Sequence, residues 1–124
     1  MNCPKCQAAM ESVEFAGIEV DRCTGCGGLW FDMLEADKLA RRKGSEVIDT
    51  GDRKIGRKQN RKRNIECPKC HTPLTKMVAP DQPHIEYESC GTCFGAYFDA
   101  GEFTDLKEHS LSDVVRRLVR KVRG

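Results

Sequence analysis

The sequence predicts a small metal-bound α+β protein that contains two tandem copies of one folding unit. The chain has 124 residues and eight cysteines. The stretch CTGCGGLWFDMLEADKL, residues 23–39, returns as CGTCFGAYFDAGEFTDL, residues 90–106, with Cys, Gly, an aromatic residue, Phe, Asp, Glu and Leu at matching positions. Units of about 40 residues rarely bury enough apolar surface to fold unaided and usually need disulfides or a metal.

The cysteine spacing favours a metal. The eight cysteines read C-x2-C-x16-C-x2-C in the first copy and C-x2-C-x19-C-x2-C in the second. Two C-x2-C turns at such a separation are typical of a four-thiolate zinc site, and here the pattern occurs twice. We therefore expect two zinc ions per chain, bound by Cys3, Cys6, Cys23 and Cys26 and by Cys67, Cys70, Cys90 and Cys93.

A disulfide framework is the less favoured use of these cysteines. The chain opens MNCPKCQAAMES, without the basic and apolar segments of a secretory signal, and has no apolar run long enough to span a membrane. We therefore expect a cytoplasmic protein, whose thiols stay reduced, and no membrane association.

Each unit begins with a predicted antiparallel β-hairpin. Apolar side chains alternate along residues 13–20 on both sides of an Ala-Gly pair, which is a hairpin signal with one apolar face. Residues 74–89 repeat this pattern with a longer tip, which accounts for the wider cysteine spacing of the second copy.

A short aromatic strand and a helix are expected to complete each unit. Residues 29–31 and 96–98 read LWF and AYF, and an Asp and a Glu three positions apart follow each strand. These acidic pairs are Asp32 with Glu35 and Asp99 with Glu102. We interpret each pair as a helix cap rather than as catalytic carboxylates, because an Asp N-cap followed by Glu at the third helical position explains the spacing.

The resulting domain organisation has four parts. We expect zinc ribbon 1 at 1–43, a basic flexible linker at 44–65, zinc ribbon 2 at 66–109 and an amphipathic basic C-terminal helix at 110–124. The linker is polar and interrupted by Gly, so it should leave the two units independent. The apolar stripe of the last helix must be covered by docking or by self-association.

Positive charge is concentrated in the linker and the tail. The formal charge is +2, and it falls to about −2 if each four-thiolate zinc site adds −2. The linker cations are Arg53, Lys54, Arg57, Lys58, Arg61, Lys62 and Arg63. They could contact phosphate backbones without reading bases, or they could only keep a spacer extended and soluble.

At the level of motifs, each copy resembles the TFIIB-type zinc finger family of small bacterial proteins. The shared residues are Cys3-Pro4-Lys5-Cys6, Gly17, Cys23, Cys26, Gly28, Trp30, Asp32 and Glu35 in the first copy, and Cys67-Pro68-Lys69-Cys70, Cys90, Cys93, Gly95, Asp99 and Glu102 in the second. The second copy departs by carrying Tyr97 in place of the Trp and no Gly at the hairpin tip. The resemblance implies a zinc ribbon fold with four-cysteine zinc coordination.

Other cysteine chemistries are weaker interpretations. A rubredoxin-like iron site uses the same two turns, a redox-active C-x-x-C needs a βαβ setting that is not indicated, and CPKCH at 67–71 also matches a haem attachment pattern. An enzyme is not expected, because four thiolates leave no open position on the metal. The histidines, at 71, 84 and 109, are scattered.

These observations predict a binding or adaptor module with no small-molecule substrate. Its partner is expected to be nucleic acid or the transcription or translation machinery. A protein–protein interaction module is the alternative, and a thiol redox or zinc-stress sensor is a third.

Overall fold

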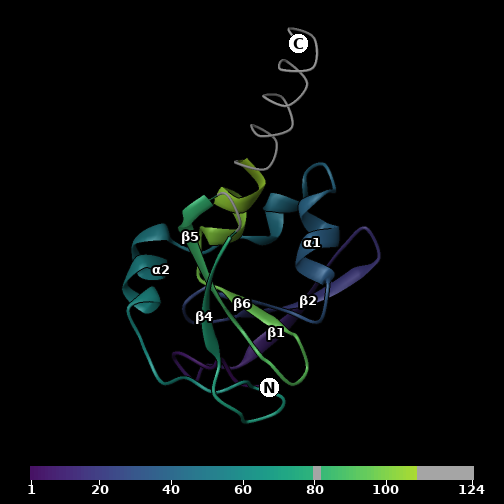
Figure 1. Cartoon of the computed structure of the whole chain (residues 1–124). Helices are drawn as coiled ribbons and strands as arrows, with labels where there is room; N and C mark the ends of the chain where they lie inside the picture. The colour runs from purple at the N-terminus through teal and green to yellow at the C-terminus, as the bar shows by residue number, and fades with distance from the viewer. Residues whose placement is uncertain (80–81, 109–124) are drawn as a thin grey trace, which may run out of the picture.

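A computed structural model, describing residues 1–79 and 82–108, joins both copies into one six-stranded antiparallel sheet (Figure 1). The strand order is β1-β2-β3-β6-β5-β4. The strands are β1 (Met10–Phe15), β2 (Ile18–Cys23), β3 (Leu29–Phe31), β4 (Thr75–Ala79), β5 (Gln82–Ser89) and β6 (Ala96–Phe98). The helices are α1 (Glu35–Ala40), the 3-10 helix η1 (Ser45–Ile48) and α2 (Arg53–Asn60), and residues 102–108 are also helical. The predicted α+β class, with a hairpin and a short helix in each unit, is confirmed.

Both hairpins form as expected. In the first, Val13 pairs with Val20, and the turn residues Ala16 and Gly17 have φ of 53° and 80°. Two successive positive φ values are the signature of a type I′ turn, whose twist suits a two-residue hairpin. In the second hairpin β4 pairs with β5, with a register shift between Val78 and Ala79.

The two units meet at the centre of the sheet. Strands β3 and β6 pair antiparallel, with Trp30 opposite Tyr97. Since these two residues are equivalent in the repeats, the pairing relates the two units by an approximate two-fold axis. The units are therefore parts of one sheet, and the expectation that they are independent is wrong.

The expected flexible linker at 44–65 is also wrong, because this segment is ordered and packed. It contains η1, which packs against β1 and α1 of the first unit, and α2, which contacts the second unit. Gly56 of α2 lies so close to residue 100 that an added Cβ would stand 2.1 Å from the Ala100 carbonyl oxygen. The Asn60 side chain donates to the Glu86 carboxylate at 3.2 Å. The backbone contact with Ala100 and the side-chain contact with Glu86 of β5 together hold α2 against the second unit.

The predicted Asp caps are replaced by other contacts. The helix at 102–108 is capped by Asp49, whose carboxylate accepts from the backbone N–H groups of Gly101 and Thr104 at 3.0 Å each. At α1 the N-cap position is Leu34, without a side-chain cap, and Glu35 accepts from the Asp32 backbone at 2.9 Å. Half of the first capping box is thus present, while the cap of the second helix comes from the linker.

The core has two parts that both draw on the two units. One surrounds the cysteines and contains the fully buried Trp30 and Tyr97. The other packs aromatic rings between sheet and helices, with Phe31 edge-on to Phe98 at a centroid separation of 5.5 Å. Such edge-to-face contacts add to the hydrophobic gain of burying large rings.

No helix within residues 1–79 and 82–108 is long and apolar enough to cross a membrane. The predicted C-terminal helix at 110–124 lies outside the described residues.

Candidate metal centres

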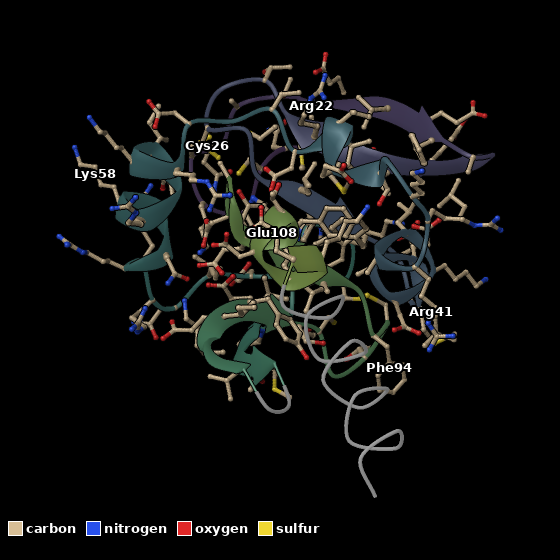
Figure 2. The ribbon with its side chains drawn as sticks, turned by 90° about the horizontal axis from the view of Figure 1, so that it is seen from above. Arg22, Cys26, Arg41, Lys58, Phe94 and Glu108 are labelled. Carbon is tan, nitrogen blue, oxygen red and sulfur yellow. The ribbon has the colours of Figure 1, made fainter. Side chains whose placement is uncertain are left out.

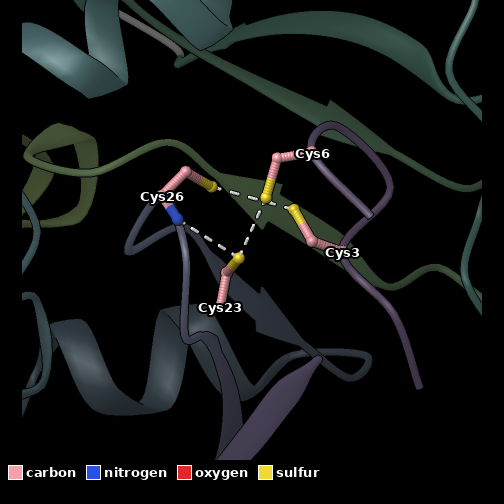
Figure 3. Close-up of side chains that lie close together, drawn as sticks. All are labelled: Cys3, Cys6, Cys23 and Cys26. Atoms are coloured by element: carbon pink, nitrogen blue, oxygen red, sulfur yellow. Dashed lines mark hydrogen bonds between the residues drawn. The ribbon is translucent and has the colours of Figure 1, made fainter. Parts of the chain in front are cut away.

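The first four-cysteine cluster forms where the turn at residues 3–6, before β1, faces the turn at residues 23–26, at the end of β2. Its four sulfur atoms all lie within 4.8 Å of one another. Figure 3 shows them converging on one point, with Cys3 and Cys26 Sγ 3.8 Å apart and Cys6 and Cys23 Sγ 3.3 Å apart. The predicted ligands of the first site are thus brought together.

The second cluster repeats this arrangement in the second unit. The sulfurs of Cys67, Cys70, Cys90 and Cys93 lie within 4.8 Å of one another. All eight cysteines of the chain are free thiols. The second set of predicted ligands is therefore also assembled, and the disulfide alternative is not adopted.

The donor set of both clusters fits zinc. Zn²⁺ takes four thiolates in a tetrahedral arrangement, and four sulfurs within such a small sphere can surround one ion. Backbone N–H groups point at the sulfurs, as Cys26 N does at Cys23 Sγ and Cys93 N at Cys90 Sγ, at 3.3 and 3.4 Å. These donors stabilise thiolate charge, so the chain binds two zinc ions.

The thiols of the first cluster affect one another through close sulfur–sulfur contacts. The contact with the Cys26 sulfur lowers the pKa of Cys3 to about 4, and the same contact raises the pKa of Cys26. Burial raises the pKa of Cys23 as well. A coordinated metal ion deprotonates such thiols outright.

Tyr97 brings the second unit into the first zinc site. Its hydroxyl lies 3.2 Å from Cys3 Sγ and 3.3 Å from Cys26 Sγ. The ring fits because position 28 is glycine: a Cβ on Gly28 would stand 1.9 Å from the Tyr97 hydroxyl oxygen. Outer-shell hydrogen bonds of this type orient metal ligands and tune their charge.

The second site has no equivalent of this phenol among the described residues. Trp30 occupies the matching place and lies against Gly95, where a Cβ would stand 2.2 Å from the indole ring. The indole N–H of Trp30 is 3.4 Å from Asp32 Oδ1, and a half-buried hydroxyl, that of Thr72, is 3.5 Å from Cys90 Sγ. The two sites are thus chemically unequal. The replacement of Trp by Tyr97 was visible in the sequence, but its role was not.

Reciprocal ion pairs connect each site with the other unit. The Lys5 ammonium, in the first C-P-K-C turn, lies 2.7 Å from both Glu88 and Asp99 carboxylates of the second unit. Lys69, in the second such turn, pairs with Asp32 of the first unit. Burial raises the pKa of Asp99 to about 6 against the opposing attraction of Lys5. Asp32 and Asp99, two of the residues expected to cap helices, therefore join the two units.

The predicted nucleic-acid residues divide into two groups. Lys54, Arg57, Lys58 and Arg61 are exposed and follow one face of α2 at i, i+3, i+4 and i+7. The other three are engaged: Arg53 pairs with Asp105 at 2.5 Å, Lys62 Nζ donates to the Lys5 carbonyl at 2.7 Å and Arg63 donates to the Asn60 carbonyl at 3.0 Å. Lys58 marks the basic face in Figure 2.

Comparison with known proteins gives one family match. The profile of the transcription factor zinc-finger family matches residues 2–42 and 66–109, which together make up more than half of the chain and contain all eight cysteines. Searches of the curated proteins and of the solved structures returned no match.

Proposed function

Since the chain belongs to the transcription factor zinc-finger family and holds two four-cysteine zinc sites, we propose that it is a zinc-stabilised module that binds nucleic acid through α2. The zinc ions contribute folding free energy, on the order of 10 kcal/mol per site in comparable small modules.

The observation that carries this proposal is the single basic face of α2. Its four exposed cations, defined above, make no ion pair within the described part of the chain. Cations presented along one helix can follow a phosphate backbone and release its counterions. Acidic side chains occur on the other side of this helix, where Arg53 meets Asp105 and Asn60 meets Glu86.

Attachment of α2 to the sheet supports the same proposal. Gly56 rests on Ala100, and the Arg53 side chain packs over Gly101. The basic face is therefore held in place before binding, so less conformational entropy is lost than with a flexible linker.

Binding of this kind should be insensitive to sequence. The basic face contains no aromatic side chain to stack on bases, and Trp30 and Tyr97 are fully buried. The holo protein has a net charge of about −2, with each zinc-thiolate site adding −2, so attraction depends on this local face rather than on total charge.

We further propose that the protein is a cytoplasmic binding protein and has no catalytic role. Four-thiolate sites need the reduced thiols that the cytoplasm maintains. They also leave no coordination position for substrate or water.

The test compares two quadruple variants with equal charge changes. In one, Lys54, Arg57, Lys58 and Arg61 are replaced by Gln; in the control, Lys38, Arg41, Arg42 and Lys43 are replaced by Gln. The control residues are exposed and lie on the opposite side of the molecule, as Arg41 and Lys58 show in Figure 2. Affinity for a short duplex is measured by fluorescence anisotropy over a range of salt concentrations.

We expect the parent to show a linear fall of log affinity with log salt, with a slope of about −0.9 per phosphate contacted. The α2 variant should flatten that slope by roughly three units with unchanged zinc content, while the control keeps the parental slope. If both variants bind as the parent does, or lose affinity equally, α2 is not the binding face. A protein partner then becomes the better proposal.

A further inference from the structure

The repeat continues beyond the segments that match the family. Cys23 and Cys90 are equivalent in the two copies, and the same spacing along the chain makes Ser112 the equivalent of Ser45 and Lys121 the equivalent of Lys54. Over these stretches SEVIDTGDRKI, residues 45–55, corresponds to SDVVRRLVRKV, residues 112–122. Ser, an acidic residue, Val, a β-branched residue, Arg and Lys recur in register. The C-terminal tail is therefore the second copy of the segment that begins with η1.

In the first copy this segment covers apolar surface. Helix η1 packs against β1 and α1. Its Ile48 is only 4% exposed, within a cluster that includes the fully buried Leu39. Further along, Gly51 is wedged between Gly27 and Ala100, since a Cβ on Gly51 would stand 2.6 Å from Ala100 Cβ and 2.9 Å from Gly27 Cα.

In the second copy, none of residues 1–79 and 82–108 covers the equivalent surface. Leu106 corresponds to the fully buried Leu39 but is only half-buried. Met77 corresponds to the half-buried Val13 but is 41% exposed. Positions that one copy protects are thus open in the other.

The residues around Gly51 also differ in exposure from their equivalents in the other copy, and they differ in side-chain size as well. Gly27 and Ala100 are buried, whereas their equivalents Phe94 and Met33 are 60% and 54% exposed. Phe94 is seen at the periphery of the molecule in Figure 2. The residue equivalent to Gly51 is Leu118. A set of three small residues in one copy is replaced by three large apolar ones in the other.

We propose that residues 112–118 dock on the second unit of their own chain as residues 45–51 dock on the first. Val115 takes the place of Ile48 against Leu106, and Leu118 lies between Phe94 and Met33. The connection from the preceding helix has the same length in both copies, so the tail can reach this surface within one molecule. Burying these side chains supplies the driving force.

The structural correspondence between the tail and the segment that begins with η1 cannot extend to Arg123. Arg123 stands where Gly56 makes its closest approach, and a Cβ at Gly56 would stand 2.1 Å from the Ala100 carbonyl oxygen. A residue as large as Arg cannot repeat that backbone contact. The docking is therefore assigned to residues 112–118 and not to the remainder of the tail.

Two adjacent valines separate this proposal from a simple amphipathic helix. Helical spacing puts Val114 and Val115 on one apolar stripe, so both would be buried. The repeat instead predicts that only Val115 is buried. Val115 corresponds to Ile48, which is 4% exposed, while Val114 corresponds to Val47, which is 63% exposed.

The experiment uses the full-length, zinc-loaded chain with labelled methyl groups. We expect nuclear Overhauser contacts from Val115 to Leu106 and from Leu118 to Phe94, and none from Val114 to Leu106. Val115→Asp should speed amide hydrogen exchange at Leu106 by about ten- to hundredfold, as expected for loss of one buried aliphatic side chain. Val114→Asp should change that exchange less than about twofold, since surface substitutions have small effects.

The proposal is overturned if the two Asp variants behave alike or if the parent lacks the Val115 and Leu118 contacts. It is also overturned if, in a mixture of labelled and unlabelled protein, these contacts arise only between molecules. A Val115→Asp chain that does not fold leaves the contacts of the parent as the deciding measurement. Nucleic-acid binding plays no part in either result.

Discussion

The lysine of each C-P-K-C turn shows how much the surroundings of a residue decide its energetic role. Lys5 and Lys69 are equivalent in sequence, and each pairs with the Asp that follows the other unit's aromatic strand. The Lys5 side chain is 0% exposed and the Asp99 side chain 1%, whereas Lys69 and Asp32 are 43% and 48% exposed. Only the first pair is shielded from solvent.

The two lysines should therefore differ in their effect on stability. Lys5→Ala leaves the buried Asp99 carboxylate without its counter-ion and leaves Glu88 with Lys76 alone, which should cost about 3–5 kcal/mol. Lys69→Ala removes a solvent-screened pair and should cost about 1 kcal/mol or less. Denaturant unfolding of the two zinc-loaded variants measures both values. Equal losses would show that the buried pair has no special role.

At the scale of elements, α2 is positioned by one glycine. An isolated helix would gain from replacing Gly by Ala, because Gly is the poorer helix former by about 1 kcal/mol. Here the Cβ of an alanine at position 56 would stand 2.1 Å from the Ala100 carbonyl oxygen and 3.0 Å from its carbonyl carbon. Backbone cannot move aside as a flexible side chain can, so α2 would have to lift from the sheet.

Gly56→Ala should thus destabilise the protein by about 1–3 kcal/mol, the usual cost of overpacking, despite its better helix propensity. Gly91→Ala is the matched control, because a Cβ there meets nothing within 4 Å. Thermal unfolding of both variants tests the difference. A Gly56→Ala chain as stable as the parent would mean that α2 is not held closely against residue 100.

On the scale of the whole molecule, the two zinc sites belong to one folding unit. Strands β3 and β6 form the centre of a single sheet, and Tyr97 of the second unit reaches the thiols of Cys3 and Cys26. The cluster around the sulfurs contains cysteines of both sites. Loss of one site therefore exposes part of the core of the other.

Cys3→Ser should accordingly unfold both units rather than the first alone. Each unit is too small to keep its core without zinc and without its neighbour. Amide correlation spectra of the variant in the presence of zinc should lose dispersed signals from residues 1–43 and 66–108 together. Retention of the dispersed signals of the second unit would contradict this cooperativity.

What the sequence determined by itself is the local structure of each repeat and its metal. The C-x-x-C turns, the alternating residues of the hairpins and the aromatic strands act over short distances along the chain, so spacing alone predicts them. The eight ligands, the two zinc ions and the hairpins could be read in this way. The helical period of Lys54, Arg57, Lys58 and Arg61 was also present, but the polar composition of the segment favoured a flexible linker.

Only the tertiary structure decided how the repeats are joined. The pairing of β3 with β6, the ion pair of Lys5 with Asp99 and the cap that Asp49 provides for Thr104 connect residues far apart in the chain. A carboxylate near a helix start suits a cap by local spacing, yet burial next to an ammonium gives Asp99 a different partner. Such contacts depend on which surfaces meet when the sheet forms, and that choice leaves no periodic pattern in the sequence.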